Sequence, residues 1–422
     1  MENPERKEEL VALCTRARKS ARVLAAASRA DKDRALLAIA KNLREAAAQG
    51  SKLRKANAED VANARASGLS ESLVDRLVLD EKRIAAIASA VEQIAAFEDP
   101  VGEVIGMKYR PSGIRVGQVR IPLGVIVMIY EARPNVTVDS AALCLKSGNA
   151  VLLRGGKEAA LSNAALGEIV RAAIVSVGLP EDAVVIVPPS GREETQILVG
   201  LNGLIDLVIP RGGEGLIRFV TEHARVPVIQ HYKGVCHLYV DEDADLEMAL
   251  NLVDNSKLSR PGVCNALECL LVHESVAAAL IPKLHKLVAK GLEVRGDERT
   301  RSYLSSAVPA TPEDFGQEFL APILAVRVVG SFGEALDHIA RFGSQHTEAI
   351  CTRSYERSQR FLREVDASCV LVNASTRFND GGELGLGAEI GISTTKLHAY
   401  GPMGLESLTA AKWIVYGEGQ TR

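Results

Sequence analysis

One cysteine in the second half of the chain has the surroundings of a reactive thiol. Cys264 follows Pro261-Gly262, a pair that favours a turn, and Arg260 lies four residues earlier. A turn can expose a side chain, and a nearby guanidinium lowers the pKa of a thiol, so that more of the nucleophilic thiolate forms. The pattern makes Cys264 a candidate nucleophile. The alternative is that Cys264 is one more buried, inert cysteine.

The other cysteines predict reduced thiols. The chain has 7 cysteines in 422 residues, an odd number scattered over its length, which argues against a closed disulfide framework. It contains no CxxC pair, no HExxH motif and no regular His/Cys spacing. We therefore expect no metal.

Charge and hydropathy exclude several classes of partner. The formal net charge of -3 at pH 7 creates no broad field for nucleic acid or an anionic membrane. The longest apolar stretch, 123–130, is far below the roughly 18 residues of a membrane-spanning helix. The N-terminus, MENPERKEEL, lacks the apolar core of a signal peptide. We expect a cytoplasmic protein that binds neither nucleic acid nor membrane.

The elements that must position Cys264 follow from hydrophobic periodicity. Apolar residues at helical spacing, such as Leu36 and Leu43, predict helices in the N-terminal region, and Asp80 is the expected N-cap of one of them. Alternating segments around Pro111-Ser112-Gly113 predict a projecting β-hairpin at 105–120.

Short apolar runs then alternate with helical stretches, which is typical of parallel sheets covered by helices. A chain of 422 residues also exceeds the size of a single core. The sequence therefore predicts an α/β fold with two lobes and a smaller appendage. The expected strands are 125–129, 150–153, 184–187 and 204–209, then a run from 236, 267–272, 323–329, 349–352 and 369–372.

Several segments resemble, in order, those of the aldehyde dehydrogenase family. They are 121–126 (IPLGVI), Arg133-Pro134-Asn135, 145–154 (LKSGNAVLLR), Cys264 with its flanks, and 318–323 (EFLAPI). The resemblance covers about residues 105 to 415. It implies an aldehyde dehydrogenase-like fold, with a Rossmann-like cofactor domain (1–104 and 121–230) and a catalytic domain (236–393). A flap formed by 105–120 and 400–422 would join subunits into a homo-oligomer.

Three further segments resemble the branch of this family that reduces L-glutamyl 5-phosphate. They are 130–137 (YEARPNVT), 234–237 (GVCH) and 385–394 (GLGAEIGIST). The resemblance implies NADPH-dependent reduction of that acyl phosphate to L-glutamate 5-semialdehyde and phosphate, through a thioester on Cys264. This is the second step of proline biosynthesis from glutamate. Glutamate 5-kinase, which makes the substrate, is a possible partner.

The resemblance also assigns catalytic roles. The amide of Asn135 and the backbone N–H of Cys264 would meet the oxyanion, and Glu318 would contact the nicotinamide ribose. Gln230 stands where hydrolytic relatives carry a Glu general base, and a neutral amide cannot take a proton from water. Phosphate is then favoured over water as the acyl partner. The adjacent His231 is either a substitute base or a structural histidine.

Cofactor and substrate candidates follow from charge. Arg154 and Lys157 replace a segment that ends in Glu in the family, which favours the 2′-phosphate of NADP over NAD. Gly212 and Gly213 follow a predicted strand, where a pyrophosphate could bind. Candidates for the charged groups of the substrate are Arg260, Arg377, Lys396, Glu383 and Glu389.

Three alternatives stay open. A hydrolytic aldehyde dehydrogenase of broader specificity would reduce its cofactor without phosphate. An inactive homologue acting as a binding protein would carry no reactive thiol. A cysteine hydrolase would turn over without nicotinamide.

Overall fold

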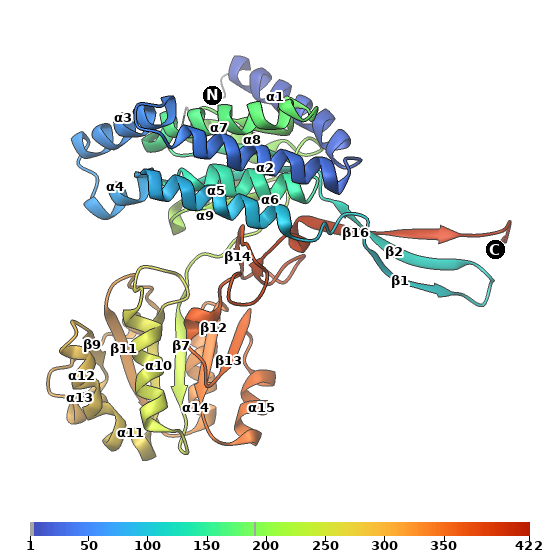
Figure 1. The fold of residues 1–422 in the computed structure, drawn as a ribbon. Coiled ribbons are helices and arrows are strands. Elements are labelled where there is room, and N and C mark those ends of the chain that lie inside the picture. Colours follow the sequence, from blue (N-terminus) through green and yellow to red (C-terminus); the bar gives the residue numbers. More distant parts are fainter. Residues whose placement is uncertain (1–3, 190) are drawn as a thin grey trace. The chain divides into compact units, whose positions relative to one another are not determined.

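The chain forms two compact units (Figure 1). The computed structural model describes residues 4–189 and 191–422. Unit 1 extends to Gln230 and includes 386–391 and 403–422, and unit 2 comprises 231–385 and 392–402. Residues 1–3 and 190 of the predicted cofactor domain lie outside the described residues. The two-lobed α/β fold class is confirmed.

Unit 1 opens with the predicted helices. Asp80 caps α5, because its side chain accepts a hydrogen bond from the amide of Arg83 at 2.7 Å. Ser28 and Asp31 form a capping box at the start of α2. The helices are α1 (Pro4–Leu24), α2 (Arg29–Ala46), α3 (Lys52–Ala66), α4 (Glu71–Leu77) and α5 (Glu81–Ala96).

A four-stranded parallel sheet follows, with the order β5-β4-β3-β6. The chain moves from β3 to β4 and β5 on one side and then returns to place β6 on the other, so the strand order reverses between β3 and β6. The strands are β3 (Val125–Tyr130), β4 (Ala150–Arg154), β5 (Val184–Ile186) and β6 (Leu207–Arg211). The helices between and after them are α6 (Asn135–Lys146), η1 (Lys157–Ala159), α7 (Ala160–Ser176), η2 (Glu181–Ala183), α8 (Arg192–Gly200) and α9 (Glu214–His223).

Within the described residues, one helical stretch is long and apolar enough to cross a membrane by length and composition alone. It is Lys157–Ser176, and half of its window is buried in the protein. Its main helix, α7, packs against α2, α3 and α6, as a core helix does.

The predicted hairpin is formed by β1 (Val104–Tyr109) and β2 (Arg115–Pro122), which pair antiparallel. The C-terminal strand β16 (Thr409–Tyr416) pairs with the other edge of β2 and completes a three-stranded sheet, which we call the flap (Figure 1). Within 400–422, the part that pairs with the hairpin is therefore β16 alone. Short helix η6 (Glu406–Leu408) precedes it, and β14 (Gly391–Ser393) pairs with β15 (Gly401–Met403).

Unit 2 contains a seven-stranded parallel sheet of order β10-β9-β11-β8-β7-β12-β13. Its strands are β7 (Cys236–Val240), β8 (Leu267–His273), β9 (Glu293–Gly296), β10 (Val308–Pro309), β11 (Ile323–Val329), β12 (Thr347–Cys351) and β13 (Cys369–Val372). Its helices are α10 (Leu246–Leu258), α11 (Glu274–Leu280), η3 (Ile281–Leu284), α12 (His285–Val288), α13 (Glu298–Tyr303), η4 (Pro312–Gly316), α14 (Phe332–Phe342), α15 (Tyr355–Glu364) and η5 (Thr376–Phe378).

The central strands of unit 2 are buried on both faces. In β8, Leu270 and Val272 belong to one hydrophobic cluster, while Cys269 and Leu271 belong to another. Successive side chains therefore enter different cores, which is why the sequence has a continuous apolar run in place of a polar alternation. Two expected strands were displaced: 204–209 is observed as Leu207–Arg211, because Gly203 and Leu204 lie in a turn, and 349–352 is observed as Thr347–Cys351.

Candidate active site

Three reactive side chains precede three neighbouring strands of unit 2. Cys264 lies just before β8, His231 before β7 and His346 directly before β12. These strands are adjacent in the order β8-β7-β12 and run parallel, so their amino ends meet at one edge of the sheet. The candidate site is therefore at the amino edge, opposite to the carboxyl edge where open α/β sheets usually bind ligands.

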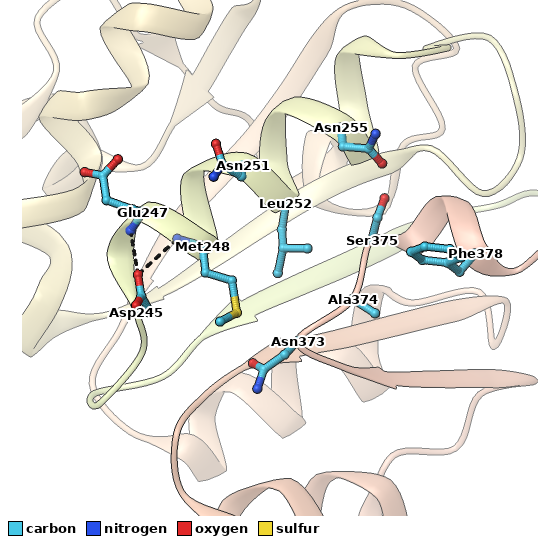
Figure 2. Close-up of a pocket in the computed structure, with 10 residues that line it drawn as sticks. All are labelled: Asp245, Glu247, Met248, Asn251, Leu252, Asn255, Asn373, Ala374, Ser375 and Phe378. Carbon is cyan, nitrogen blue, oxygen red and sulfur yellow. Dashed lines mark hydrogen bonds between the residues drawn. The ribbon is translucent and has the colours of Figure 1, made fainter.

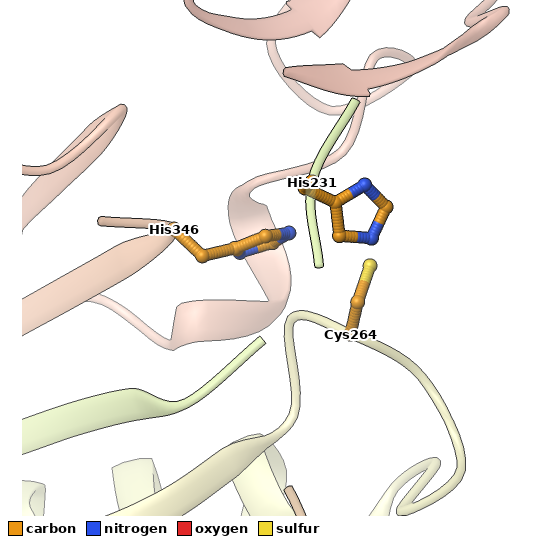
Figure 3. A group of neighbouring side chains, drawn as sticks. All are labelled: His231, Cys264 and His346. Carbon is orange, nitrogen blue, oxygen red and sulfur yellow. The ribbon is translucent and has the colours of Figure 1, made fainter. Parts of the chain in front are cut away.

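The structure brings the thiol and the two imidazoles together (Figure 3). One ligating atom from each of Cys264, His231 and His346 lies within 4.8 Å of the others. The Nδ1 atom of His231 is 3.1 Å from the carbonyl oxygen of Ile392. A carbonyl only accepts, so Nδ1 carries the proton and Nε2 of the neutral ring keeps its lone pair. That lone pair can take the proton of a thiol.

Cys264 differs from most other cysteines in exposure. All seven thiols are free, and only Cys264 and Cys369 are half-buried. Burial raises the pKa of Cys369 to about 11 and that of Cys14 and Cys351 to about 12, so these thiols stay protonated at neutral pH. Cys264 itself is half-buried and not deeply packed.

The loop that carries Cys264 is anchored by the next residue. The buried Asn265 donates from Nδ2 to the carbonyl of Asn379 at 3.0 Å, and its own carbonyl accepts from the Thr376 hydroxyl at 2.7 Å. The guanidinium of Arg377 donates to the Asn265 side-chain oxygen. Arg377 is thus the substrate candidate that contacts the residue next to the nucleophile.

A buried ion pair ties the two elements that flank this loop. Lys257, near the end of α10, contacts Glu268 of β8 at 2.5 Å, and both side chains are almost fully buried. Burial raises the pKa of Glu268 to about 7 and lowers that of Lys257, because each charge loses water. The amide of Leu320 also donates to Glu268, at 3.4 Å. The pair joins the nucleophile loop to the segment that follows Glu318.

Gly234 packs directly against the nucleophile. A Cβ atom at this position would lie 1.8 Å from the carbonyl oxygen of Cys264, so only glycine fits. The amide of Gly234 donates to the Glu318 carboxylate at 2.9 Å. Cys236 donates its thiol to the same Cys264 carbonyl at 3.2 Å. Glu318, predicted to contact cofactor, is therefore connected to the nucleophile through a single glycine.

The other predicted substrate residues are less closely connected to the thiol. Lys396 is exposed, and its ammonium contacts Asp366 at 2.7 Å, so this cation already has a counter-ion. Arg260 and Glu383 are exposed. Glu389 is half-buried and belongs to unit 1. Their roles stay predictions.

Unit 1 carries a possible phosphate site where its strand order reverses. Gly213 caps α9 after β6, and its amide donates to the carboxylate of Glu131, which follows β3, at 2.9 Å. A carboxylate here occupies the position of an anion at a helix N-terminus, so the backbone fits a phosphate group. A Cβ on Gly212 would lie 2.5 Å from the same carboxylate. Gly212 and Gly213 thus lie where a dinucleotide would be expected.

Arg154, one of the two cations predicted for a 2′-phosphate, makes contacts within unit 1, and its role stays a prediction. The Arg154 guanidinium donates to the carbonyl of Gly191 at 3.0 Å and lies 3.7 Å from the buried carboxylate of Glu194. Glu194 also pairs with Arg6, so one carboxylate is shared between two guanidinium groups. Lys157, at the start of η1, is exposed and is the better candidate.

Asn135, the predicted oxyanion donor, begins α6 in unit 1. Its side-chain amide donates to Asp139 one turn later at 3.0 Å, which fixes the orientation of the amide. Burial raises the pKa of Asp139 to about 6, while Asn135 and Arg211 oppose this shift. Asn135 and Cys264 belong to different units, and the role of Asn135 stays a prediction.

One surface hollow in unit 2 lies away from the thiol (Figure 2). It has a volume of about 610 Å³ and lies between α10 and the segment after β13. Among its lining residues are Asp245, Asn255 and Phe378, and none of the predicted site residues lines it. This hollow is therefore separate from the group around Cys264.

Sequence reasoning did not identify His346. It stands alone before an apolar run, with no partner at motif spacing, and only the strand order places it beside Cys264. His231 was considered, although the sequence favoured a structural role.

Comparison with known proteins agrees with this architecture. Residues 3–304 match the aldehyde dehydrogenase family, and the chain belongs to that family. The acetylating aldehyde dehydrogenase from Geobacillus thermoglucosidasius shares the fold, with a TM-score of 0.69 at 18% identity over 99% of this chain and 98% of that one. Members of the family use NAD or NADP.

Within the family, the chain belongs with the gamma-glutamyl phosphate reductases. The protein of that name from Sorangium cellulosum (strain So ce56) is 70% identical over 98% of this chain and 97% of its own length. That from Desulfatibacillum aliphaticivorans is 54% identical over 98% and 99%. The crystal structure of gamma-glutamyl phosphate reductase from Thermotoga maritima has a TM-score of 0.95 at 45% identity, over 98% of this chain and all of that one.

Replacing Gly234 by alanine should damage catalysis more than stability. The added methyl group would push the backbone of Cys264 away, and a displacement near 1 Å can cost about 100-fold in rate. Gly262→Ala is the matched control, because a Cβ there meets only the Leu320 carbonyl at 3.8 Å. We expect kcat to fall about 100-fold in Gly234→Ala and to stay near wild type in Gly262→Ala. Circular dichroism of both variants checks that they are folded. Equal kcat values would contradict the role assigned to Gly234.

Proposed function

We propose that this chain reduces L-glutamyl 5-phosphate to L-glutamate 5-semialdehyde and phosphate with NADPH, through a thioester on Cys264, as the second step of proline biosynthesis. The observation that carries the proposal is the half-buried Cys264 thiol with the His231 imidazole beside it, in a chain whose full length matches gamma-glutamyl phosphate reductases. The substrate is inferred from the similarity to those reductases, and the thiol–imidazole pair provides a nucleophile and its base.

In the first half-reaction the nucleophile and its base come from unit 2, and Asn135 stays a predicted oxyanion donor. Nε2 of His231 takes the proton of Cys264, and the thiolate attacks the acyl carbon of the substrate. The bond from that carbon to the phosphate oxygen breaks, which leaves a thioester on Cys264. The departing phosphate takes the proton from the imidazolium, so His231 returns to its neutral form. The backbone N–H of Cys264 is the proposed oxyanion donor on this loop.

The groups proposed to hold NADPH lie in unit 1, and Glu318 is proposed to contact its ribose. Gly212 and Gly213 would place backbone amides against the pyrophosphate, and Lys157 would face the 2′-phosphate. The support for this fit is the Glu131 carboxylate, which already accepts a hydrogen bond at the N-terminus of α9. When bound, NADPH supplies the hydride that converts the thioester to the aldehyde and restores the Cys264 thiolate.

We also propose that the enzyme is a cytoplasmic homo-oligomer joined through the flap. The flap exposes large apolar side chains on its strands, including Tyr109 (76% exposed) and Trp413 (64%). Exposed aromatic residues on a sheet are typical of protein interfaces. Glutamate 5-kinase remains a proposed partner, because an acyl phosphate hydrolyses readily in free solution.

The reverse reaction provides the test of mechanism. Wild-type protein, supplied with glutamate semialdehyde and NADP, should form NADPH only when inorganic phosphate is present. Cys264→Ala should lose activity by about 10³-fold or more, because no thioester can form. Cys369→Ala, the other half-buried thiol, is the control and should keep wild-type rates. NADPH formation without phosphate would favour the hydrolytic alternative, and activity in Cys264→Ala would overturn the mechanism.

Charge reversal at Lys157 tests the cofactor assignment. Lys157→Glu should raise the KM for NADPH by about tenfold or more, since one charge-assisted contact to the 2′-phosphate is lost. The KM for NADH should change little or fall. Lys41→Glu reverses a similarly exposed lysine on α2 and should leave both constants unchanged. Equal effects on NADPH and NADH would remove Lys157 from the cofactor site.

A further inference from the structure

We propose that His231, Cys264 and His346 form a binding site for a soft divalent cation, Zn²⁺, and that its occupancy switches the nucleophile off. The ligating atoms of the three side chains lie within 4.8 Å of one another, and the rings converge on the sulfur (Figure 3). Modest closure of this triangle gives the ligand separations of a tetrahedral zinc site. The fourth position would be left to water.

One of the two imidazoles is held in the tautomer that a metal requires. Nδ1 of His231 is engaged by the Ile392 carbonyl at 3.1 Å, and Nδ1 of His346 lies 2.7 Å from the hydroxyl of Thr347. The carbonyl fixes the proton of His231 on Nδ1 and leaves Nε2 to face the group, whereas the Thr347 hydroxyl can donate or accept and so suits either tautomer of His346. A carbonyl or hydroxyl on the second ring nitrogen is the usual outer contact of a metal-bound histidine.

The donor set selects the metal. One sulfur and two imidazole nitrogens, with no carboxylate in the group, suit Zn²⁺ or Co²⁺ and disfavour Mg²⁺ and Ca²⁺, which prefer oxygen. Binding would form a bond from Cys264 sulfur to the metal and release the thiol proton. A sulfur that is bound in this way cannot attack an acyl phosphate.

A second group of similar composition, His237, Cys269 and His338, does not qualify. Although burial by itself lowers the pKa of His237, Glu348 at 2.9 Å and the neighbouring Cys269 raise it to about 10, so the ring is cationic. The Arg327 guanidinium lies 3.2 Å from Nδ1 of His338. Two cations at this position repel a metal ion. The same residue types therefore have different chemistry at the two places.

Cobalt provides a direct readout that needs no turnover. Wild-type protein titrated with Co²⁺ should develop visible bands of tetrahedral cobalt and a near-ultraviolet sulfur-to-cobalt band, and Zn²⁺ should displace them. Cys264→Ser should lose the near-ultraviolet band. His346→Ala should weaken Co²⁺ affinity by about tenfold or more. Cys369→Ser, which changes the other half-buried thiol, should bind as the wild type does.

Activity assays test the consequence, which rests on the proposed function. Zn²⁺ should inhibit wild-type reductase reversibly, with full recovery on chelation, and the inhibition constant should rise about tenfold or more in His346→Ala. A sulfur-to-cobalt band that survives in Cys264→Ser, or unchanged metal affinity in His346→Ala, would overturn the site. Metal binding without reductase activity would refute the proposed function alone, and reductase activity without a cobalt spectrum would refute the metal site alone.

Discussion

The candidate site depends on the parallel register of three neighbouring strands. Strands in a sheet are about 4.8 Å apart, so residues that precede β8, β7 and β12 come within side-chain reach of one another. Cys264, His231 and His346 are far apart in the sequence and meet only through this pairing. The two faces of a central strand pack into two different hydrophobic cores. A slip of one residue would move each side chain into the wrong core. Core packing therefore holds the register, and the register holds the site.

Beyond the strand ends, no sheet ladder holds the backbone, and other contacts must do so. Asn265 binds the backbone after β13, the Lys257–Glu268 pair joins α10 to β8, and the missing side chain of Gly234 lets two loops touch. The buried pair loses hydration, a cost of several kcal/mol per ion that its mutual attraction must offset. Loss of one partner would leave an unpaired charge behind the nucleophile. The site is positioned by polar anchors, each of which fixes the loop at a different point.

Sequence periodicity predicted the fold well because the elements are long and regular. The helices before the hairpin, the hairpin with its turn and most parallel strands were expected, whereas the small β9, β10, β14 and β15 were not. Cys264 was identified from its local Pro-Gly context and from family resemblance. His346 could not be, since its partner lies 82 positions away and strand order is a tertiary property. The contact between Arg154 and Glu194, 40 residues apart, likewise leaves no local signal in the sequence.

One constraint on His231 accounts for both reactivities of the thiol. The Ile392 carbonyl holds the proton on Nδ1, so the lone pair of Nε2 is available to Cys264. A lone pair that can accept a proton from the thiol can also bind a soft metal. In the proposed metal site the Cys264 sulfur is a second ligand. Gln230, which directly precedes His231 in the chain, adds neither a base nor an anionic ligand. A carboxylate at that position would help water attack a thioester and would also strengthen metal binding. In the proposed mechanism the neutral amide favours transfer to phosphate, and in the proposed metal site it leaves three protein ligands.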